Sequence, residues 1–230
     1  MNHHRLPWTL IRVDLGESVP LGAGDFAGLC FMGGPMSVND ELPWIGGELA
    51  LIRDAVAHEV PVIGHCLGGQ LLARALGGVV TRNREREIGW TRVVATPTRE
   101  ARDWLGPVAA FDAFQWHGET FSLPTGATRI LGSEGCANQA YVLGPRGGIH
   151  LGMQFHIEMT EALIRNWNTA WANEFAPPVL GRYVQRPDEQ FARIKDALPA
   201  MRAMAERVYA RWMAGVGVSV QAEPRRTSVA

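Results

Sequence analysis

A cysteine flanked by glycines is the residue best suited to do chemistry in this chain. It lies in Gly64-His65-Cys66-Leu67-Gly68, between an apolar run at residues 60–64 and a helical pattern at residues 67–76. A G-x-nucleophile-x-G pattern at a strand-to-helix junction makes a tight turn that exposes the central side chain. Free N–H groups at the start of the helix favour a thiolate over a thiol. The alternative, a buried structural cysteine, would need no glycine on either side.

A histidine and a glutamate further along the chain could supply a base and its orienting group. The segment Gln154-Phe155-His156-Ile157-Glu158 ends the last expected strand. Residues two apart project to the same side of an extended chain, so imidazole and carboxylate can lie close together. Glu158 would then hold one ring nitrogen of His156 and leave the other for Cys66. Without the cysteine turn, such a pair would more often be a solvated strand face.

Two further segments are candidates for lining a ligand crevice. Gly33 and Gly34 follow a strand expected at residues 28–33, where backbone N–H groups could face an oxyanion, although an ordinary tight turn is the alternative. Trp116 and His117 are cleft candidates, with His117 either a second base or a satisfied, half-buried histidine. The charge run at residues 82–87 is typical of a solvated face, with contact to an acceptor domain as the alternative.

These side chains must be positioned by alternating strands and helices. Short apolar runs predict strands at residues 8–14, 28–33 and 60–64, and periodic patterns predict helices at 43–57 and 67–76. This alternation indicates a doubly wound, mostly parallel α/β sheet. Residues 79–155 predict mainly strands, some of them antiparallel at one side. Two more helices are expected at 161–173 and 188–212, the second kinked or split at Pro199.

Composition excludes several classes of protein. The chain has 230 residues, with 22 Lys and Arg against 23 Asp and Glu, so no bulk field would attract nucleic acid or an acidic membrane. No apolar run reaches the roughly 18 residues of a spanning helix, and the start lacks the apolar core of a signal peptide. Three scattered cysteines, with Cys30 and Cys136 expected to pack, indicate neither a disulfide framework nor a metal site. We expect a cytoplasmic protein without cofactor or metal.

The order and spacing of five segments resemble the class I (triad) glutamine amidotransferases, most closely the stand-alone GMP-synthase-like members. The segments are residues 32–37, 64–70, 86–90, 115–119 and 154–158. The resemblance implies a flavodoxin-like fold and a catalytic triad of Cys66, His156 and Glu158. It also implies an oxyanion hole formed by the backbone N–H groups of Gly34 and Leu67, and substrate binding by Gln70.

The chain departs from the family pattern at two places. Ile157 stands where many members have proline. The family also begins with a strand and a helix before the segment that matches residues 8–14, so the first strand and helix of the fold are expected to be missing. The hypothesis at this point is that Met1 is an internal start, or that the chain is truncated and unstable. We expect an amidotransferase domain at residues 1–184, a helical extension at 185–214 and a disordered tail at 215–230.

The function expected from these features is hydrolysis of the glutamine side-chain amide through a γ-glutamyl thioester. The released ammonia would serve a separate acceptor synthetase, because no nucleotide-binding motif follows residue 171. One alternative is a hydrolase of γ-glutamyl peptides or conjugates that uses the same triad. The other is a degenerate binding module without catalysis, against which the intact triad residues argue.

Overall fold

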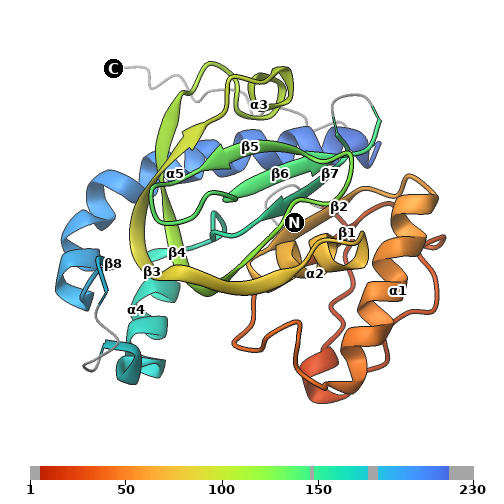
Figure 1. The fold of residues 1–230 in the computed structure, drawn as a ribbon, viewed down its shortest axis with the longest axis horizontal. Coiled ribbons are helices and arrows are strands. Elements are labelled where there is room, and N and C mark those ends of the chain that lie inside the picture. Colours follow the sequence, from red (N-terminus) through yellow and green to blue (C-terminus); the bar gives the residue numbers. More distant parts are fainter. Residues whose placement is uncertain (1–5, 146–147, 176–180, 218–230) are drawn as a thin grey trace, which may run out of the picture.

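All the described strands belong to one central sheet, and helices cover both of its faces (Figure 1). The computed structural model describes residues 6–145, 148–175 and 181–217. Seven strands follow the order β1-β2-β7-β6-β5-β3-β4, and the eighth, β8 (Tyr183–Val184), pairs with β3. The expected doubly wound α/β fold, with an antiparallel region at one side, is confirmed.

The three parallel strands carry the part of the sheet that positions the site. β1 (Leu29–Phe31), β2 (Val62–His65) and β7 (His150–Met153) lie side by side, so their carboxyl ends lie at one edge. All residues of β2 and β7 are buried, as expected of parallel strands covered on both faces. At this edge, Gly33 and Gly34 follow β1, Cys66 follows β2, and His156 follows β7.

The rest of the sheet is antiparallel. β7 pairs with β6 (Ala140–Leu143), which pairs with β5 (Thr128–Gly132). β5 then pairs with β3 (Val80–Ala95), and β3 with β4 (Ala110–Phe121). β3 is longer than expected, because it includes the charge run, where the register with β4 shifts between Arg82 and Glu87.

The helices bury two separate cores, one on each face. α1 (Pro43–Ala57) and α2 (Leu67–Ala75) cover the face to which Val62 points. α3 (Arg99–Leu105) and α5 (Pro187–Gly215) cover the face of Ile63, and α4 (Glu161–Ala170) packs on α5. Adjacent residues of β2 thus belong to opposite cores, which follows from the alternation of side chains along a strand.

Several expectations about the elements need correction. The strand expected at residues 8–14 is wrong: these residues pair with none of the described strands, and Val13–Leu15 form a 3₁₀ turn, η2. A strand is stable only beside a hydrogen-bonded neighbour, and apolar content alone does not supply one. α5 continues through Pro199 without being split. α3 and β8 were not expected. The tail expected at 215–230 lies outside the described residues from position 218 onward.

Candidate active site

Cys66 lies in a turn that only glycines allow. Its backbone has φ 49° and ψ −105°, a left-handed conformation that costs a side-chain-bearing residue about 1–3 kcal/mol. A Cβ on Gly64 would lie 2.4 Å from the backbone of Gly68, and one on Gly68 would lie 2.2 Å from the carbonyl oxygen of Phe31. These approaches confirm that small residues are needed on both sides of the cysteine. The expected exposure of its side chain is wrong, because Cys66 is only 6% exposed.

His156 and Glu158 form a buried pair next to this cysteine. The imidazole Nδ1 lies 2.6 Å from Oε1 of Glu158, which leaves Nε2 for the thiol. Burial disfavours a charged imidazole, but Glu158 and a hydrogen bond to Cys66 outweigh it and raise the pKa of His156 to about 10. Burial likewise opposes the carboxylate, yet His156 and His65 lower the pKa of Glu158 to about 2. The pair is therefore an imidazolium and a carboxylate at neutral pH.

The two glycines after β1 pack closely against the cysteine turn and the imidazole. A Cβ on Gly34 would lie 3.1 Å from the Leu67 side chain, so the Gly34 loop packs against the first residue of α2. A Cβ on Gly33 would lie 2.6 Å from Cε1 of His156 and 3.5 Å from Cβ of Cys66. A side chain on Gly33 would clash with the imidazole, so a glycine lets the backbone of this loop pack directly against His156 and Cys66.

Two glutamines connect the cysteine to the helix that follows it. Nε2 of Gln154 lies 3.6 Å from Sγ of Cys66, and its Oε1 accepts a hydrogen bond from Nε2 of Gln70 at 3.2 Å. Both side chains are buried, Gln70 3% and Gln154 0% exposed. Gln70 thus lies within reach of the candidate site, but its described bond goes to Gln154.

A cluster of four aromatic rings reaches the imidazole through one of its members, Trp167. Trp167 of α4 lies edge-on to His156, with ring centroids 4.8 Å apart. Trp116 contacts Trp167 at 5.8 Å, and Trp171 and Phe175 at 5.4 and 5.7 Å. The carbonyl of Trp116 also lies 3.9 Å from Sγ of Cys66. Trp116 thus lies next to the candidate thiol and imidazole, and its role in a cleft stays a prediction.

His117 belongs to a different, neighbouring network. Its Nε2 lies 2.9 Å from Oε2 of Glu87, and its Nδ1 lies 2.9 Å from the carbonyl oxygen of Glu119. Oε2 of Glu87 also accepts a bond from Gln139 at 2.7 Å, and Oε1 one from Ser133 at 3.0 Å. Glu87 is fully buried, so the charge run is not uniformly a solvated face. Both His117 nitrogens are occupied, and neither is free to serve a thiol.

The network around Glu87 includes a second thiol and has the composition of a metal site. Ligand atoms of Glu87, His117 and Cys136 lie within 4.8 Å of one another. Burial raises the pKa of Cys136 to about 11, and its Sγ lies 3.2 Å from Oγ1 of Thr120. The ligand atoms of all three residues already have protein partners.

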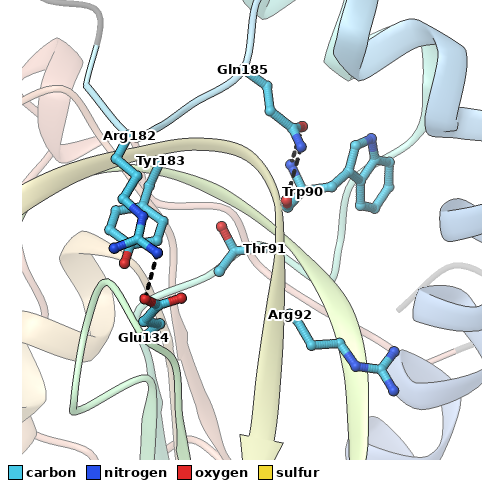
Figure 2. A pocket seen from close by; sticks show the side chains of 7 residues that line it. All are labelled: Trp90, Thr91, Arg92, Glu134, Arg182, Tyr183 and Gln185. Atoms are coloured by element: carbon cyan, nitrogen blue, oxygen red, sulfur yellow. Dashed lines mark hydrogen bonds and ion pairs between the residues drawn. The ribbon is translucent and has the colours of Figure 1, made fainter.

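A separate pocket of about 210 Å³ lies over β3 and β8 (Figure 2). An ion pair between Arg182 and Glu134, 2.7 Å long, borders it, and the side chain of Gln185 bonds both backbone groups of Trp90. None of the candidate catalytic residues lines this pocket. The candidate chemistry is therefore concentrated at the thiol turn.

Three residues at the site were not identified from the sequence. Gln154 lies two positions before His156, so the same alternation that predicted the His156–Glu158 pair could have included it. His65 is 1% exposed and lies immediately before Cys66. Tyr209, whose hydroxyl lies 2.9 Å from His65 Nε2, comes from α5, more than 140 positions away. No local pattern signals such a contact.

Comparisons with known proteins agree with this architecture. The family model "Glutamine amidotransferase class-I" matches residues 4–166. The chain is 32% identical to the glutamine amidotransferase-like protein YfeJ of Salmonella typhimurium, over 71% of this chain and 70% of that protein. It is 33% identical to one subunit of the glutamine-hydrolysing GMP synthase of Saccharolobus solfataricus, over 56% of this chain and 65% of that subunit.

A solved structure is similar over the whole length. The crystal structure of a glutamine amidotransferase from Methylobacillus flagellatus superposes with a TM-score of 0.88 at 43% identity, covering 100% of this chain and 91% of that one. The matched length therefore includes α5, which lies beyond the residues that the family model matches. Within the described ranges, no helix is both long and apolar enough to cross a bilayer.

Proposed function

We propose that this chain, which belongs to the class-I glutamine amidotransferase family, hydrolyses a γ-glutamyl amide with Cys66 as nucleophile and glutamine as substrate. Family membership implies amidotransferase or glutaminase-type activity in general, whereas the residues and the substrate are our proposal. The observation that carries it is the arrangement around His156. Its Nδ1 bonds Glu158 at 2.6 Å, and its other side faces a cysteine in a strained turn at the start of α2.

In the first half of the reaction, the thiolate of Cys66 attacks the γ-carbonyl carbon and forms a carbon–sulfur bond. The carbonyl electrons move to oxygen, which the backbone N–H groups of Gly34 and Leu67 would stabilise. The oxyanion then reforms the carbonyl, the carbon–nitrogen bond breaks, and His156 donates its proton to the departing nitrogen. Ammonia leaves, and the γ-glutamyl group remains on sulfur as a thioester.

In the second half, water replaces the ammonia. The now neutral His156 takes a proton from water as the oxygen attacks the thioester carbon. The carbon–sulfur bond breaks, the thiolate is restored next to the imidazolium, and glutamate is released. Glu158 keeps the ring oriented and stabilises its positive charge in both halves. We propose that Gln70 acts with Gln154 to hold the bound substrate.

The ammonia acceptor would be a separate protein. The GMP synthase relative is named as one subunit of its enzyme, which supports a two-protein arrangement with a synthetase partner. A second candidate is a hydrolase of γ-glutamyl conjugates, which needs no partner. The aromatic rings of Trp116, Trp167, Trp171 and Phe175 near His156 favour it, because they could contact a leaving amine larger than ammonia.

Ammonia or amine release tests these candidates directly. Wild type and Cys66→Ser are compared on glutamine and on γ-glutamyl dipeptides. Release from glutamine by wild type alone supports the amidotransferase, and faster turnover of the dipeptides supports the conjugate hydrolase. Equal background rates for both proteins on every substrate would overturn both and leave the binding module.

A further inference from the structure

One oxygen of the candidate triad carboxylate lacks a hydrogen bond. Oε1 of Glu158 bonds His156, whereas the buried Oε2 has no hydrogen-bond partner among the described residues. An unpaired buried carboxylate oxygen is costly unless a nearby donor or positive charge compensates. The polar side-chain atom that faces it is Nε2 of His65, 3.9 Å away.

His65 is held at this position by the C-terminal helix. Its ring is 1% exposed, and its Nε2 lies 2.9 Å from the hydroxyl of Tyr209 on α5. The two rings contact each other with centroids 5.9 Å apart. Burial lowers the pKa of His65 and raises that of Tyr209, so at neutral pH the imidazole is uncharged and the phenol keeps its proton.

A neutral imidazole carries one proton, and its position decides what His65 does. With the proton on Nε2, the N–H group donates to the Tyr209 oxygen 2.9 Å away, and the same nitrogen lies 3.9 Å from Oε2 of Glu158. The hydroxyl then anchors the ring, and the partial positive charge of the N–H group lies near the unpaired oxygen. Such an arrangement steadies the carboxylate without adding a second full charge to the site.

We propose that Tyr209 and His65 are positioning residues of the triad, which hold the carboxylate of Glu158 in the orientation that His156 requires. They form a relay from α5, outside the residues that the family model matches, to the imidazole at the thiol. The inference rests on the proposed function, because it assigns these residues to the catalytic apparatus. Neither residue contacts the reacting atoms in this scheme.

Four titratable groups from three parts of the chain surround His65. Glu158 and His156 lie on the segment after β7, and Tyr209 lies on α5. Sγ of Cys30 on β1 lies 4.0 Å from Nδ1, and burial raises its pKa to about 12, so this thiol stays uncharged. Loss of the Tyr209 hydroxyl therefore acts on the carboxylate and, through it, on His156.

Tyr209→Phe is the discriminating variant, because it removes one oxygen and keeps the ring packing. We expect kcat to fall about 3- to 10-fold with little change in KM, as one ordinary hydrogen bond would account for. A looser carboxylate supports the imidazolium less, so the alkaline limb of activity should move to lower pH by about 0.5–1 unit. Tyr183→Phe, the same change at the pocket of Figure 2, is the matched control and should behave as wild type.

A double-variant cycle separates positioning from a structural role. If Tyr209 acts through Glu158, Tyr209→Phe has no further effect in a Glu158→Gln background. An equal loss of kcat in both backgrounds, or a Tyr209→Phe protein identical to wild type, would overturn the proposal. His65→Gln provides a second variant if Tyr209→Phe lowers the melting temperature, and it should show the same non-additivity.

Alkylation of Cys66 by iodoacetamide, followed against pH, keeps this test independent of the proposed substrate. The reaction reports the thiol–imidazole pair whether or not glutamine is hydrolysed. A shifted alkaline inflection in Tyr209→Phe, together with no ammonia release by wild type, would support the relay and reject the proposed function. If wild type releases ammonia and the alkaline inflection is unshifted in both Tyr209→Phe and His65→Gln, the proposed function is supported and the positioning role of Tyr209 and His65 is rejected.

Discussion

Two clusters of the same three residue types lie in this molecule, and their surroundings differ. Cys66, His156 and Glu158 gather at the carboxyl edge of the parallel strands. Cys136, His117 and Glu87 gather beside the β3–β4 pair, in the antiparallel region. Both histidine–glutamate pairs are close, with nitrogen–oxygen distances of 2.6 and 2.9 Å.

The difference lies in the second nitrogen of each histidine and in the backbone of each cysteine. The other nitrogen of His117 is taken by the carbonyl oxygen of Glu119, while that of His156 is left for a thiol. Cys66 lies in a left-handed turn at the start of α2, whereas Cys136 lies in a buried loop that raises its pKa to about 11. A histidine–carboxylate pair can therefore be a structural tie or a base, depending on what remains unpaired.

Removal of the thiol should give the largest difference in turnover between the two clusters. We expect Cys66→Ser to lower turnover by at least about 10³-fold, because a hydroxyl next to this imidazole is a far weaker nucleophile. Cys136→Ser should stay within about twofold of wild type, since no reacting group depends on it. Initial rates of ammonia release, with melting temperatures as the check on folding, measure both. An equal loss in the two variants would contradict the distinction.

Removal of each imidazole should separate activity from stability. His156→Ala is expected to lower kcat about 10²–10⁴-fold through loss of the acid–base group. His117→Ala removes one of the three hydrogen-bond partners of the buried Glu87 and a fully buried ring, and should lower the free energy of unfolding by about 3–5 kcal/mol. Urea unfolding and steady-state kinetics on both proteins provide the comparison. A stable His117→Ala protein would show that this network is not a structural tie.

Substitution of the two glutamates should show the same division, with Glu158 affecting activity and Glu87 affecting stability, but with smaller effects than substitution of the histidines. Glu158→Gln is expected to lower kcat about 10- to 100-fold, less than His156→Ala, because orientation contributes less than proton transfer. Glu87→Gln should lower the free energy of unfolding by about 1–3 kcal/mol and leave kcat of the folded protein nearly unchanged. A Glu158→Gln protein as inactive as His156→Ala would reverse this ranking.

The raised pKa of His156 also predicts a pH dependence of stability. The pKa of His156 is raised from 6.5 to about 10, so its stabilisation is fully present below pH 6.5 and is lost as pH rises toward 10. The difference in free energy of unfolding between wild type and His156→Gln should therefore shrink across that window. Chemical unfolding at pH 6, 8 and 10 measures it, and a constant difference would contradict the raised pKa.

Sequence reasoning succeeded where local pattern and backbone geometry coincide. The glycines around Cys66 correctly predicted a tight turn. The alternation of side chains correctly predicted that His156 and Glu158 form a close pair. Continuous apolar runs also located β2 and β7, which are buried on both faces, and a periodic apolar pattern located α1. The strand expected at residues 8–14 failed because strand formation depends on a neighbour that local composition does not specify.

The features that the sequence did not predict depend on contacts between residues far apart in the chain. Glu87 lies in a charge run, yet β3 carries it into the interior, where partners from two other segments satisfy it. Tyr209 meets His65 only because α5 packs over the same face of the sheet as Ile63. Neither contact has a signature within the few residues that define a motif.

Isolation of the covalent intermediate shows which residue is the nucleophile. Wild type is mixed with glutamine, quenched in acid during turnover, digested and mapped by mass spectrometry, with Cys66→Ser and Cys136→Ser treated in parallel. We expect a γ-glutamyl group on the peptide that contains Cys66, in wild type and Cys136→Ser alike. Wild-type rates of ammonia release from Cys66→Ser, or a γ-glutamyl group on another residue, would contradict it.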